Sequence, residues 1–409
     1  MRIVRHGLSR ADQRTYSEQV TEILRNVRKE GDRAVLRYTR QFDKAELGPK
    51  ELQVPYEEVE ASIGILESEV LWGLQTAIAN VRTVVKAQLR DSTVVELPQG
   101  QRVEVVELPV GRVGLYAPAG RAAYPSSVVM GAVTARAAGV DQVVVCAPPG
   151  PGGEAHPVIL AACALCGVTD VFRMGGAQAI AAMAYGTESV QPVDVIAGPG
   201  NAYVQEAKRQ LAGQVGIDGI AGPSELLVLA SPGADPELVA LDLLAQAEHG
   251  PDSLVGLIAT DKTLIDDVIG WVERLVPERP SVVASELSVV HMAEPRTALW
   301  AAEIFAPEHL ELVGPAVEAL AGEVRKAGCL FVGAGAATAF GDYVAGSNHV
   351  LPTGGAARFQ SALSAATFRR RMARVSFPEG AAARLAPAGA AVARAEGFPV
   401  HAESMERRA

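Results

Sequence analysis

The adjacent residues Glu308 and His309 are the pair in this sequence best suited to acid–base chemistry. They stand in APEHLEL (306–312), directly before a strand-like run. A histidine has an ordinary pKa of about 6.5 and is the natural general base at neutral pH, and a neighbouring carboxylate can hold the imidazolium or activate water. Adjacent residues in an extended strand point to opposite faces, whereas in a turn both can reach one cavity. The pair therefore predicts an acid–base centre, although an exposed pair at a strand edge would have the same sequence.

A predicted helix within DPELVALDLLAQAEHG (235–250) carries candidate metal ligands. Asp235 is placed to cap its start, and Gly250 lies just beyond its end. Asp242, Gln246 and His249 follow at i, i+4 and i+7, so they share one helical face. Such a stripe can face water or bind a metal ion, for which histidine is a common ligand and glutamine an uncommon one.

Two further segments place polar side chains among glycines and prolines, as binding loops do. GDYVAGSNHVLPTGG (341–355) contains Asp342, a plausible oxygen ligand, and His349. ARAEGFPVHAESM (393–405) contains Glu396 and His401, after a predicted helix that Gly397 should end.

Two glycine-rich strings are candidates for contact with a phosphate group. GPGNAY (198–203) and GAGAAT (333–338) both have the first two glycines of G-x-G-x-x-G but not the third. GPGNAY follows the apolar run VDVIA and opens a predicted helix, so its backbone N–H groups could face an anion. A tight strand-to-helix turn would need the same glycines, and both interpretations stay open.

The composition excludes several classes of protein. The net charge of −10 argues against binding of nucleic acid, and no apolar run is long enough to span a membrane. The start, MRIVRHGLSRADQ, lacks the apolar stretch of a secretion signal, and the four cysteines are too few to cross-link 409 residues. Cys163 and Cys166 lie in an alanine-rich helical stretch, which favours buried structural thiols over a zinc or redox site. We expect a cytoplasmic protein.

The pattern of elements predicts an α/β fold. The first 90 residues are helical in pattern, two strands follow within 92–116, and short Val/Ile-rich strands then alternate with helices. This alternation predicts two mostly parallel sheets, each covered by helices on both faces. The last 45 residues are rich in alanine and arginine, and we expect them to be helical and to dock onto another surface, such as a second subunit.

Taken in order, eight strings spread over nearly the whole chain resemble the histidinol dehydrogenase family. They are VGRVGLYAPAGRAAYPSS (110–127), MGGAQAIAAMAYGT (174–187), IAGPGNAYVQEAKRQ (196–210), IAGPSELLVLA (220–230), AQAEHG (245–250), FAPEHLEL (305–312), GDYVAGSNHVLPT (341–353) and AEGFPVH (395–401). An ordered set of this kind is far more specific than any one motif.

The resemblance implies an intertwined homodimer with two incomplete Rossmann-like α/β domains, one inserted in the other, and small terminal segments. It divides the chain into an N-terminal segment (1–19), a discontinuous first domain that carries the metal and acid–base residues (20–115 and 226–363), an inserted domain that contacts NAD (116–225), and a tail that reaches the partner subunit (364–409).

The resemblance also implies a reaction, the oxidation of L-histidinol through L-histidinaldehyde to L-histidine with two NAD, at the end of histidine biosynthesis. His309 would be the general base and Glu308 would activate water. One zinc ion per subunit would be bound by Gln246, His249, Asp342 and, from the partner's tail, His401. The remaining implied contacts are those with NAD (Tyr116, Gln178 and Asn201) and those with the substrate (Ser224, His349 and Glu396, together with Gln246, His249, His309, Asp342 and His401).

The sequence departs from the family pattern in a few places and leaves two other functions open. Ala119 stands where the family usually has glycine, Pro399 lies between Glu396 and His401, and ARFQSALS (357–364) differs from the usual form. None of these changes removes an acid, a base or a ligand. A zinc hydrolase with Glu308 as base, or a metal or metabolite binder without activity, could use the same ligands.

Overall fold

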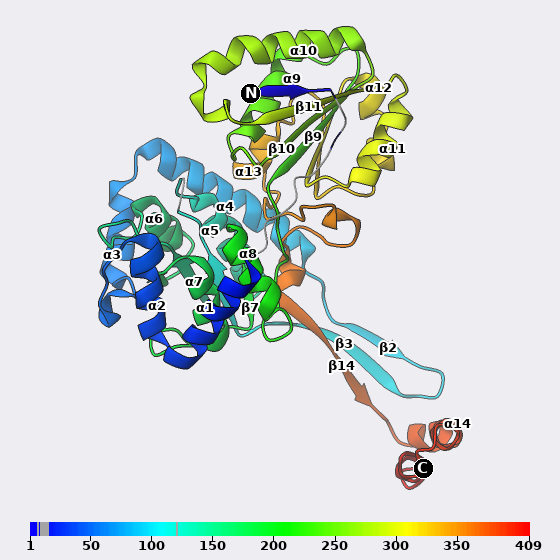
Figure 1. The fold of residues 1–409 in the computed structure, drawn as a ribbon. Helices are drawn as coiled ribbons and strands as arrows, with labels where there is room; N and C mark the ends of the chain where they lie inside the picture. Colours follow the sequence, from blue (N-terminus) through cyan, green and yellow to red (C-terminus); the bar gives the residue numbers. More distant parts are fainter. Residues whose placement is uncertain (6–7, 9–15, 120–121) are drawn as a thin grey trace.

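A computed structural model describes residues 1–5, 8, 16–119 and 122–409, and within these residues it contains three β-sheets (Figure 1). Two are parallel sheets covered by helices, and the third is a small antiparallel sheet. This arrangement confirms the predicted α/β fold with parallel sheets. Within the same described residues, no helix is both long and apolar enough to cross a membrane.

The five-stranded sheet has the order β6-β5-β4-β7-β8, with all strands parallel. Alternate residues of a strand face opposite sides, so Val143 and Val145 of β5 pack with α5 and α6, and Val144 and Cys146 pack with α7. The elements are β4 (Arg112–Tyr116), α5 (Pro125–Ala137), β5 (Gln142–Ala147), α6 (Pro157–Leu165), β6 (Asp170–Arg173), α7 (Gly176–Tyr185), β7 (Val195–Ala197), α8 (Ala202–Leu211) and β8 (Gly216–Ile217).

The six-stranded sheet has the order β1-β11-β10-β9-β12-β13 and is also parallel throughout. Leu226 and Val228 of β9 pack with α9 and α10, whereas Leu227 and Leu229 pack with α11 and α12. The elements are β1 (Arg2–Val4), β9 (Glu225–Ala230), α9 (Pro236–Ala247), β10 (Leu254–Ala259), α10 (Lys262–Leu275), β11 (Glu286–His291), α11 (Pro295–Phe305), β12 (His309–Val313), α12 (Pro315–Glu318), β13 (Cys329–Val332) and α13 (Thr338–Tyr343).

Apart from β1, the two sheets have the same strand order. In each sheet the first strand in chain order, β4 or β9, is central, the second and third lie to one side, and the fourth and fifth lie to the other. The chain therefore reverses its direction of travel across the sheet between β4 and β7 and between β9 and β12. In open parallel sheets, ligands usually bind at the carboxyl ends of the strands at such a reversal.

The N-terminal helices correct the predicted grouping of residues 20–115 with residues 226–363. The helices α1 (Ser17–Glu30), α2 (Asp32–Tyr38), α3 (Tyr56–Ala61) and α4 (Ser68–Gln88) all pack on the five-stranded side of the molecule. The apolar face of α1 packs in the same core as α7, and the apolar face of α4 packs in the same core as α5. Each helix thereby buries its apolar face. Of the predicted segment 1–19, residues 2–4 pair with β11, and residues 9–15 lie outside the described residues.

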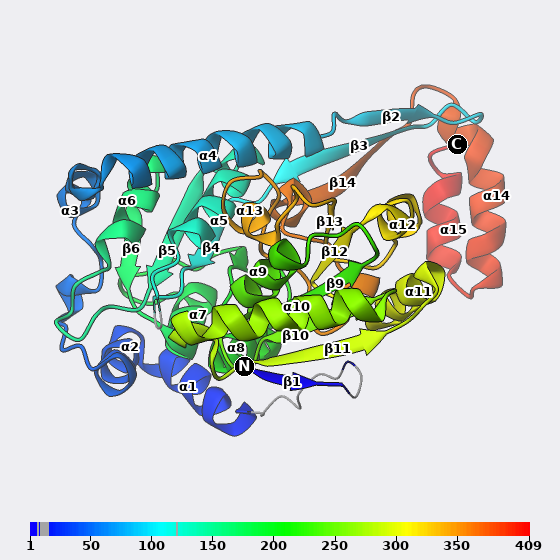
Figure 2. The same ribbon diagram turned by 90° about the horizontal axis from the view of Figure 1, so that it is seen from above.

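The third sheet and the tail extend away from both parallel sheets (Figures 1 and 2). The strands β2 (Thr93–Glu96), β3 (Arg102–Pro109) and β14 (Arg369–Ser376) form an antiparallel ribbon that leads to α14 (Ala381–Ala395) and α15 (Pro399–Glu406). The expectation that the last 45 residues are helical is therefore wrong for β14, which pairs with β3 along its whole length. Ion pairs of Arg371 with Glu107 and of Arg374 with Glu104 support this pairing.

Short helical turns complete the described chain. They are the π-helical turn Thr39–Asp43 and the 3-10 turns Pro49–Glu51, Ser62–Ile65, Val276–Glu278, Pro280–Val282, Ala321–Glu323, Ala356–Arg358 and Ala365–Phe368. All four cysteines are free thiols, and Cys163 and Cys166 are buried, as the sequence predicts.

Candidate active site

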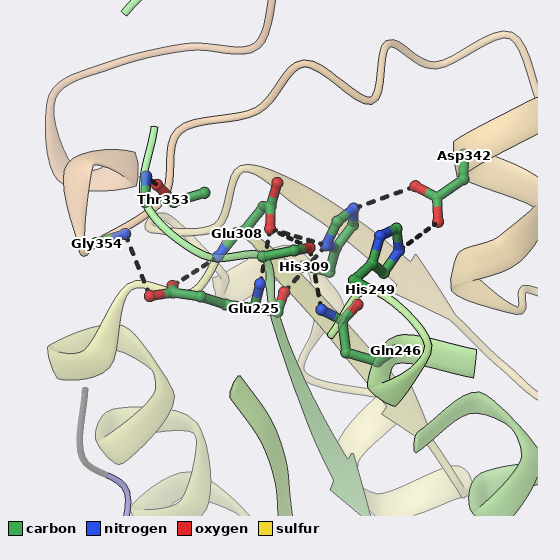
Figure 3. Close-up of polar contacts among 10 residues, drawn as sticks. Glu225, Gln246, His249, Glu308, His309, Asp342, Thr353 and Gly354 are labelled. Carbon is green, nitrogen blue, oxygen red and sulfur yellow. Dashed lines mark hydrogen bonds and ion pairs between the residues drawn. The ribbon is translucent and has the colours of Figure 1, made fainter. Parts of the chain in front are cut away.

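The acid–base pair lies at the amino ends of the central strands of the six-stranded sheet (Figure 3). His309 begins β12, and Glu308 precedes it in a turn whose entry, Ala306, has a left-handed backbone with φ of 50°. Both side chains are buried, and Glu308 Oε2 lies 3.6 Å from His309 Nδ1. The turn thus brings both groups to one place.

Three hydrogen bonds fix Glu308 and its neighbour Ser224. Glu308 Oε2 accepts from the Ser224 hydroxyl at 2.7 Å and from the backbone N–H of Glu225 at 2.7 Å. The Ser224 hydroxyl in turn accepts from Gln246 Nε2 at 3.0 Å. The carboxylate oxygen that faces His309 therefore has a fixed position before any ligand arrives.

Glu225, the first residue of β9, is a structural partner that the sequence analysis missed. Its carboxylate accepts hydrogen bonds from the backbone N–H of Glu308 at 3.3 Å and of Gly354 at 3.2 Å, so it ties together the start of β12 and the loop after β13. The sequence signal that could have marked it is its place directly before the apolar run LLVLA, because a carboxylate that is buried there needs hydrogen-bond partners.

The environment of His309 leaves one ring nitrogen available as a base. Nδ1 lies 3.0 Å from the Glu225 carbonyl oxygen, which can only accept a hydrogen bond, so we assign the ring proton to Nδ1. Nε2 then carries the lone pair and lies 3.7 Å from Asp342 Oδ1. Burial lowers the pKa of His309, which favours the neutral, proton-accepting ring.

Burial has the opposite effect on the carboxyl group beside it. It raises the pKa of Glu308 to about 8, although the hydrogen bonds from Glu225 N–H and from Ser224 favour the ionised form. With this pKa the group is largely protonated at neutral pH, and once ionised it is a stronger base than an ordinary carboxylate. The pair therefore has the protonation chemistry expected of an acid–base centre.

Gln246, His249 and Asp342 come together beside this pair and offer oxygen and nitrogen ligands. The Gln246 side-chain oxygen Oε1 is buried and has no hydrogen-bond partner, and His249 Nε2 lies 3.7 Å from Asp342 Oδ2. This donor set fits zinc, which takes nitrogen and oxygen ligands, and the unpartnered amide oxygen is consistent with a ligand role. No group of three or more His, Cys, Asp and Glu side chains with metal-binding geometry occurs in the described part of the chain.

Charge couples Asp342 to the surrounding histidines. Burial acts to raise the pKa of Asp342, but the hydrogen bond with His249 and the charges of His309 and His349 outweigh it, so the pKa lies below its ordinary value. The same hydrogen bond raises the pKa of His249. His349 is held through Nδ1, 2.8 Å from the Asp342 carbonyl oxygen. Asp342 is therefore ionised at neutral pH, as a metal ligand must be.

Asp242 does not join this group, although it shares the predicted helical face with Gln246 and His249. Its side chain is hydrogen-bonded to Glu311 on β12. Burial and the Asp242 charge raise the pKa of Glu311 to about 9, so this carboxyl group is protonated at neutral pH and can bond to its neighbour.

Glu396 and His401 lie in the tail, which Figure 1 shows leading away from the two parallel sheets. They line a hollow of about 440 Å³ between α14 and α15, together with Val392, Phe398 and Met405. Within one chain the structure therefore does not bring these two residues to the other site residues.

The three residues implied in NAD contact lie at the carboxyl edge of the five-stranded sheet. Tyr116 ends β4, and its hydroxyl oxygen accepts from Gly176 N–H at 3.1 Å. Gln178, in the first turn of α7, is 1% exposed, and its amide nitrogen and oxygen both lack a partner. Asn201 caps α8 by accepting from the backbone N–H groups of Tyr203 and Val204 at 3.0 and 3.2 Å.

A buried ion pair, also missed from the sequence, holds the GPGN loop. Lys208 and Asp218 form a close pair within the core, Lys208 Nζ donates to the Gly198 carbonyl at 3.1 Å, and Gly198 N–H donates to Asp218 at 2.8 Å. Gly198 has φ of 119°, and a Cβ there would lie 2.3 Å from the Tyr116 carbonyl oxygen, so only glycine fits.

Known proteins are similar to this chain in sequence and in fold. A histidinol dehydrogenase family model matches residues 8–409. Histidinol dehydrogenase from Gluconobacter oxydans is 43% identical over 404 residues, covering 97% of this chain and 94% of the relative, and that from Parasynechococcus marenigrum is 44% identical, covering 97% and 92%. The crystal structure of histidinol dehydrogenase from Elizabethkingia anophelis matches with a TM-score of 0.93 at 32% identity, covering 100% of this chain and 98% of that one. The chain therefore belongs to the histidinol dehydrogenase family, a family of NAD-dependent oxidoreductases of histidine biosynthesis.

Proposed function

We propose that the protein oxidises L-histidinol through L-histidinaldehyde to L-histidine, with two molecules of NAD and one zinc ion per subunit. The buried Glu308–His309 pair, adjacent to the unpartnered oxygen of Gln246, carries this proposal. Each oxidation removes one hydride and one proton from the substrate. NAD takes the hydride, so the chain itself has to bind, orient and move protons.

Zinc would be held by Gln246, His249 and Asp342, with His401 supplied by a second copy of the chain. When bound, it would orient the imidazole and amino nitrogens of histidinol by coordination. Ser224, His349 and Glu396 would position the rest of the substrate, with Glu396 again coming from the second copy.

His309 would take the alcohol proton at Nε2 as the hydride leaves for the first NAD. Its Nδ1, which we assign as bonded to the Glu225 carbonyl, keeps the ring in the required tautomer. Glu308 would then accept a proton from water as that water adds to the aldehyde, and His309 would return its proton to the former carbonyl oxygen, which gives the hydrate and leaves His309 neutral again. The hydrate loses its second hydride to the second NAD and a proton to His309, which leaves the carboxylic acid.

The five-stranded sheet would hold NAD through Tyr116, Gln178 and Asn201. The shared strand order of the two sheets supports their interpretation as two incomplete Rossmann-like domains. Residues 116–225 would form the inserted domain, which interrupts the chain of the domain that contains residues 226–363. The unpartnered amide of Gln178 supports a ligand at this edge, because buried polar groups normally have partners.

An intertwined homodimer would bring each tail to the partner's acid–base pair. The ribbon and tail expose large apolar side chains, among them Val375, Val392, Phe398 and Val400, which favours their burial against another surface. We place the enzyme in the cytoplasm, where its free thiols would stay reduced.

Formation of NADH tests this function against the two alternatives. Zinc-loaded protein given histidinol and NAD should produce two NADH for each histidine formed, measured by absorbance and by amino-acid analysis. A zinc hydrolase would form no NADH, and a binding protein without activity would form neither product.

Mixed dimers test the shared site. A His401→Ala subunit combined with a Glu308→Ala/His309→Ala subunit should regain activity, because one of the two sites then contains every wild-type residue. No recovery in dimers shown to be mixed would place each site within a single chain.

A further inference from the structure

Asp43 is a charged residue that the acid–base site does not use, and it lies at the carboxyl edge of the five-stranded sheet. It ends the π-helical turn Thr39–Asp43, and its side chain lies beside Gly175 and Pro148. A Cβ atom at Gly175 would be 3.2 Å from Asp43 Oδ1 and 2.6 Å from Pro148 Cβ. Pro148 directly follows β5, and Gly175 follows β6. The carboxylate is therefore placed at the ends of two adjacent strands.

This edge contains several polar atoms without partners. Asp43 Oδ2 is buried and has no hydrogen-bond partner, and the same holds for the amide nitrogen and oxygen of Gln178. Tyr116 links the two residues. Its hydroxyl accepts a hydrogen bond from the backbone of Gly176, two residues before Gln178, and its pKa, raised mainly by burial, is raised further by the Asp43 charge. Buried polar atoms usually have partners, so unpartnered ones close together indicate a place where a ligand supplies the missing hydrogen bonds.

The position of Asp43 identifies the group it would bind. In sheets that bind dinucleotides, an acidic residue near the end of the second strand accepts hydrogen bonds from the adenosine ribose. The second strand here is β5, which ends in Cys146 and Ala147 and is followed by two prolines, so it has no acidic residue at that place. Asp43 brings a carboxylate to the same end of the sheet from the N-terminal helical region.

We propose that Asp43 accepts hydrogen bonds from the hydroxyl groups of the adenosine ribose of NAD and thereby selects NAD over NADP. The 2′-phosphate of NADP would place negative charge against the carboxylate, whereas a free hydroxyl can donate to it. This inference rests on the proposed use of NAD and adds a specificity-determining residue to it.

Binding measurements on the zinc-loaded protein with the variant Asp43→Asn test this role. Calorimetry with NAD, NADP and nicotinamide mononucleotide, each as the added ligand, gives three dissociation constants. We expect the dissociation constant for NAD to rise at least about 10-fold, because a hydrogen bond to a charged group is lost. NADP should bind no more weakly than to the wild type. Nicotinamide mononucleotide, which lacks the adenosine ribose, should bind unchanged.

Two controls separate this role from a structural one. Asp141→Asn, an exposed change at the opposite end of β5, should leave all three dissociation constants unchanged. The melting temperature of Asp43→Asn should not fall, because the buried oxygen makes no hydrogen bond that asparagine would lose. A structural role would instead lower the melting temperature and weaken nicotinamide mononucleotide as well. If Asp43→Asn does not fold, Asp43→Ser gives the same comparison without the carboxylate.

The outcomes distinguish this inference from the proposed function. If the wild type binds NAD and Asp43→Asn keeps the wild-type ratio of NAD to NADP affinity, the role of Asp43 is wrong and the use of NAD stands. If the wild-type protein binds no NAD at all, the proposed function itself fails.

Discussion

The two parallel sheets share a strand order but carry their candidate functional residues at opposite ends. In the five-stranded sheet, Tyr116 and the loops that follow β6 and β7 lie at the carboxyl ends, as is usual for this topology. In the six-stranded sheet, Glu225 and His309 are the first residues of their strands, so the acid–base pair lies at the amino ends. Strand order alone therefore does not locate a site.

The two ends also differ in how their polar groups are satisfied. At the acid–base end, Glu308 and Glu225 are held by protein hydrogen bonds, and the unpartnered Gln246 Oε1 is a proposed zinc ligand, whereas at the nucleotide end Gln178 and Asp43 Oδ2 lack partners. Asn348, on the loop after α13, donates to the Met130 carbonyl and the Thr134 hydroxyl of α5 and so ties the loop that carries His349 to a helix that covers the five-stranded sheet. We infer that one end is prearranged for chemistry, while the other is completed by its ligand.

Replacing His309 should have the largest effect and should affect only the acid–base end. His309→Asn removes the general base, so we expect turnover of histidinol to fall about 10²- to 10⁴-fold. Zinc content and the dissociation constant for NAD should stay unchanged, measured by metal analysis and calorimetry. The exposed change His291→Asn, on β11 of the same sheet, is the matched control and should keep full turnover. A similar loss of NAD binding in His309→Asn would contradict the separation of the two ends.

Replacing Lys208 should have the next largest effect, and it acts on the nucleotide end through stability. Lys208→Met leaves Asp218 buried without its cation, which costs about 3–5 kcal/mol of the free energy of unfolding. Thermal unfolding would show a lower melting temperature. The exposed change Lys262→Met, at the start of α10, should leave that temperature unchanged. An unchanged melting temperature in Lys208→Met would show that the pair does not hold the GPGN loop.

Gln178→Met should separate stability from NAD binding. Methionine fills a similar volume without the two unpartnered polar atoms, so the melting temperature should stay the same or rise. NAD should bind about 10-fold more weakly, because the ligand loses its amide partner. Gln246→Met is the contrasting change at the acid–base end. It breaks the hydrogen bond to Ser224 and should not raise the melting temperature. Weaker folding of Gln178→Met would show that its amide has a structural role.

The sequence predicted those parts of the site that depend on local pattern. Helical periodicity placed Gln246 and His249 on one side of a helix; α9 ends at Ala247, so His249 lies in the turn after it, and Asp235 caps that helix as expected. Proximity of Asp342 came only from the family resemblance, because a distant segment brings it there. Burial decides the roles of Glu225 and Asp43, and a single sequence does not reveal how a carboxylate is buried.

The same physical limit explains the errors in the fold. The strand β14 reads RRRMARVS, which has little β character by itself. It pairs along its whole length with β3, a strand far away in sequence, whose Glu104 and Glu107 form ion pairs with its arginines. The apolar faces of α1 and α4 were evident from periodicity, but their choice of sheet depends on which surface has a matching shape.

The smallest predicted effect is a dependence of stability on pH that distinguishes Asp43 from asparagine. Burial raises the pKa of Asp43 to about 6 from its ordinary value of 3.8. Between these values the folded protein binds more protons than the unfolded chain, so the free energy of unfolding falls as pH rises through that range. The amide introduced by Asp43→Asn does not titrate. The stability of Asp43→Asn relative to the wild type should therefore increase by about 1 to 2 kcal/mol between pH 4 and pH 7, a range that allows for the partial exposure of the carboxylate.

Binding of NAD should shift the pKa of Asp43 in the opposite direction, toward lower values. A carboxylate that accepts hydrogen bonds from a ribose is stabilised in its ionised form, so its pKa falls when NAD binds. The dissociation constant of the wild type for NAD should therefore rise as pH falls below about 6, and that of Asp43→Asn should lack this component. Histidines that titrate in the same range are present in both proteins and cancel in the difference. If the dissociation constants of the two proteins for NAD change with pH in the same way, NAD does not donate a hydrogen bond to the unpartnered oxygen of Asp43.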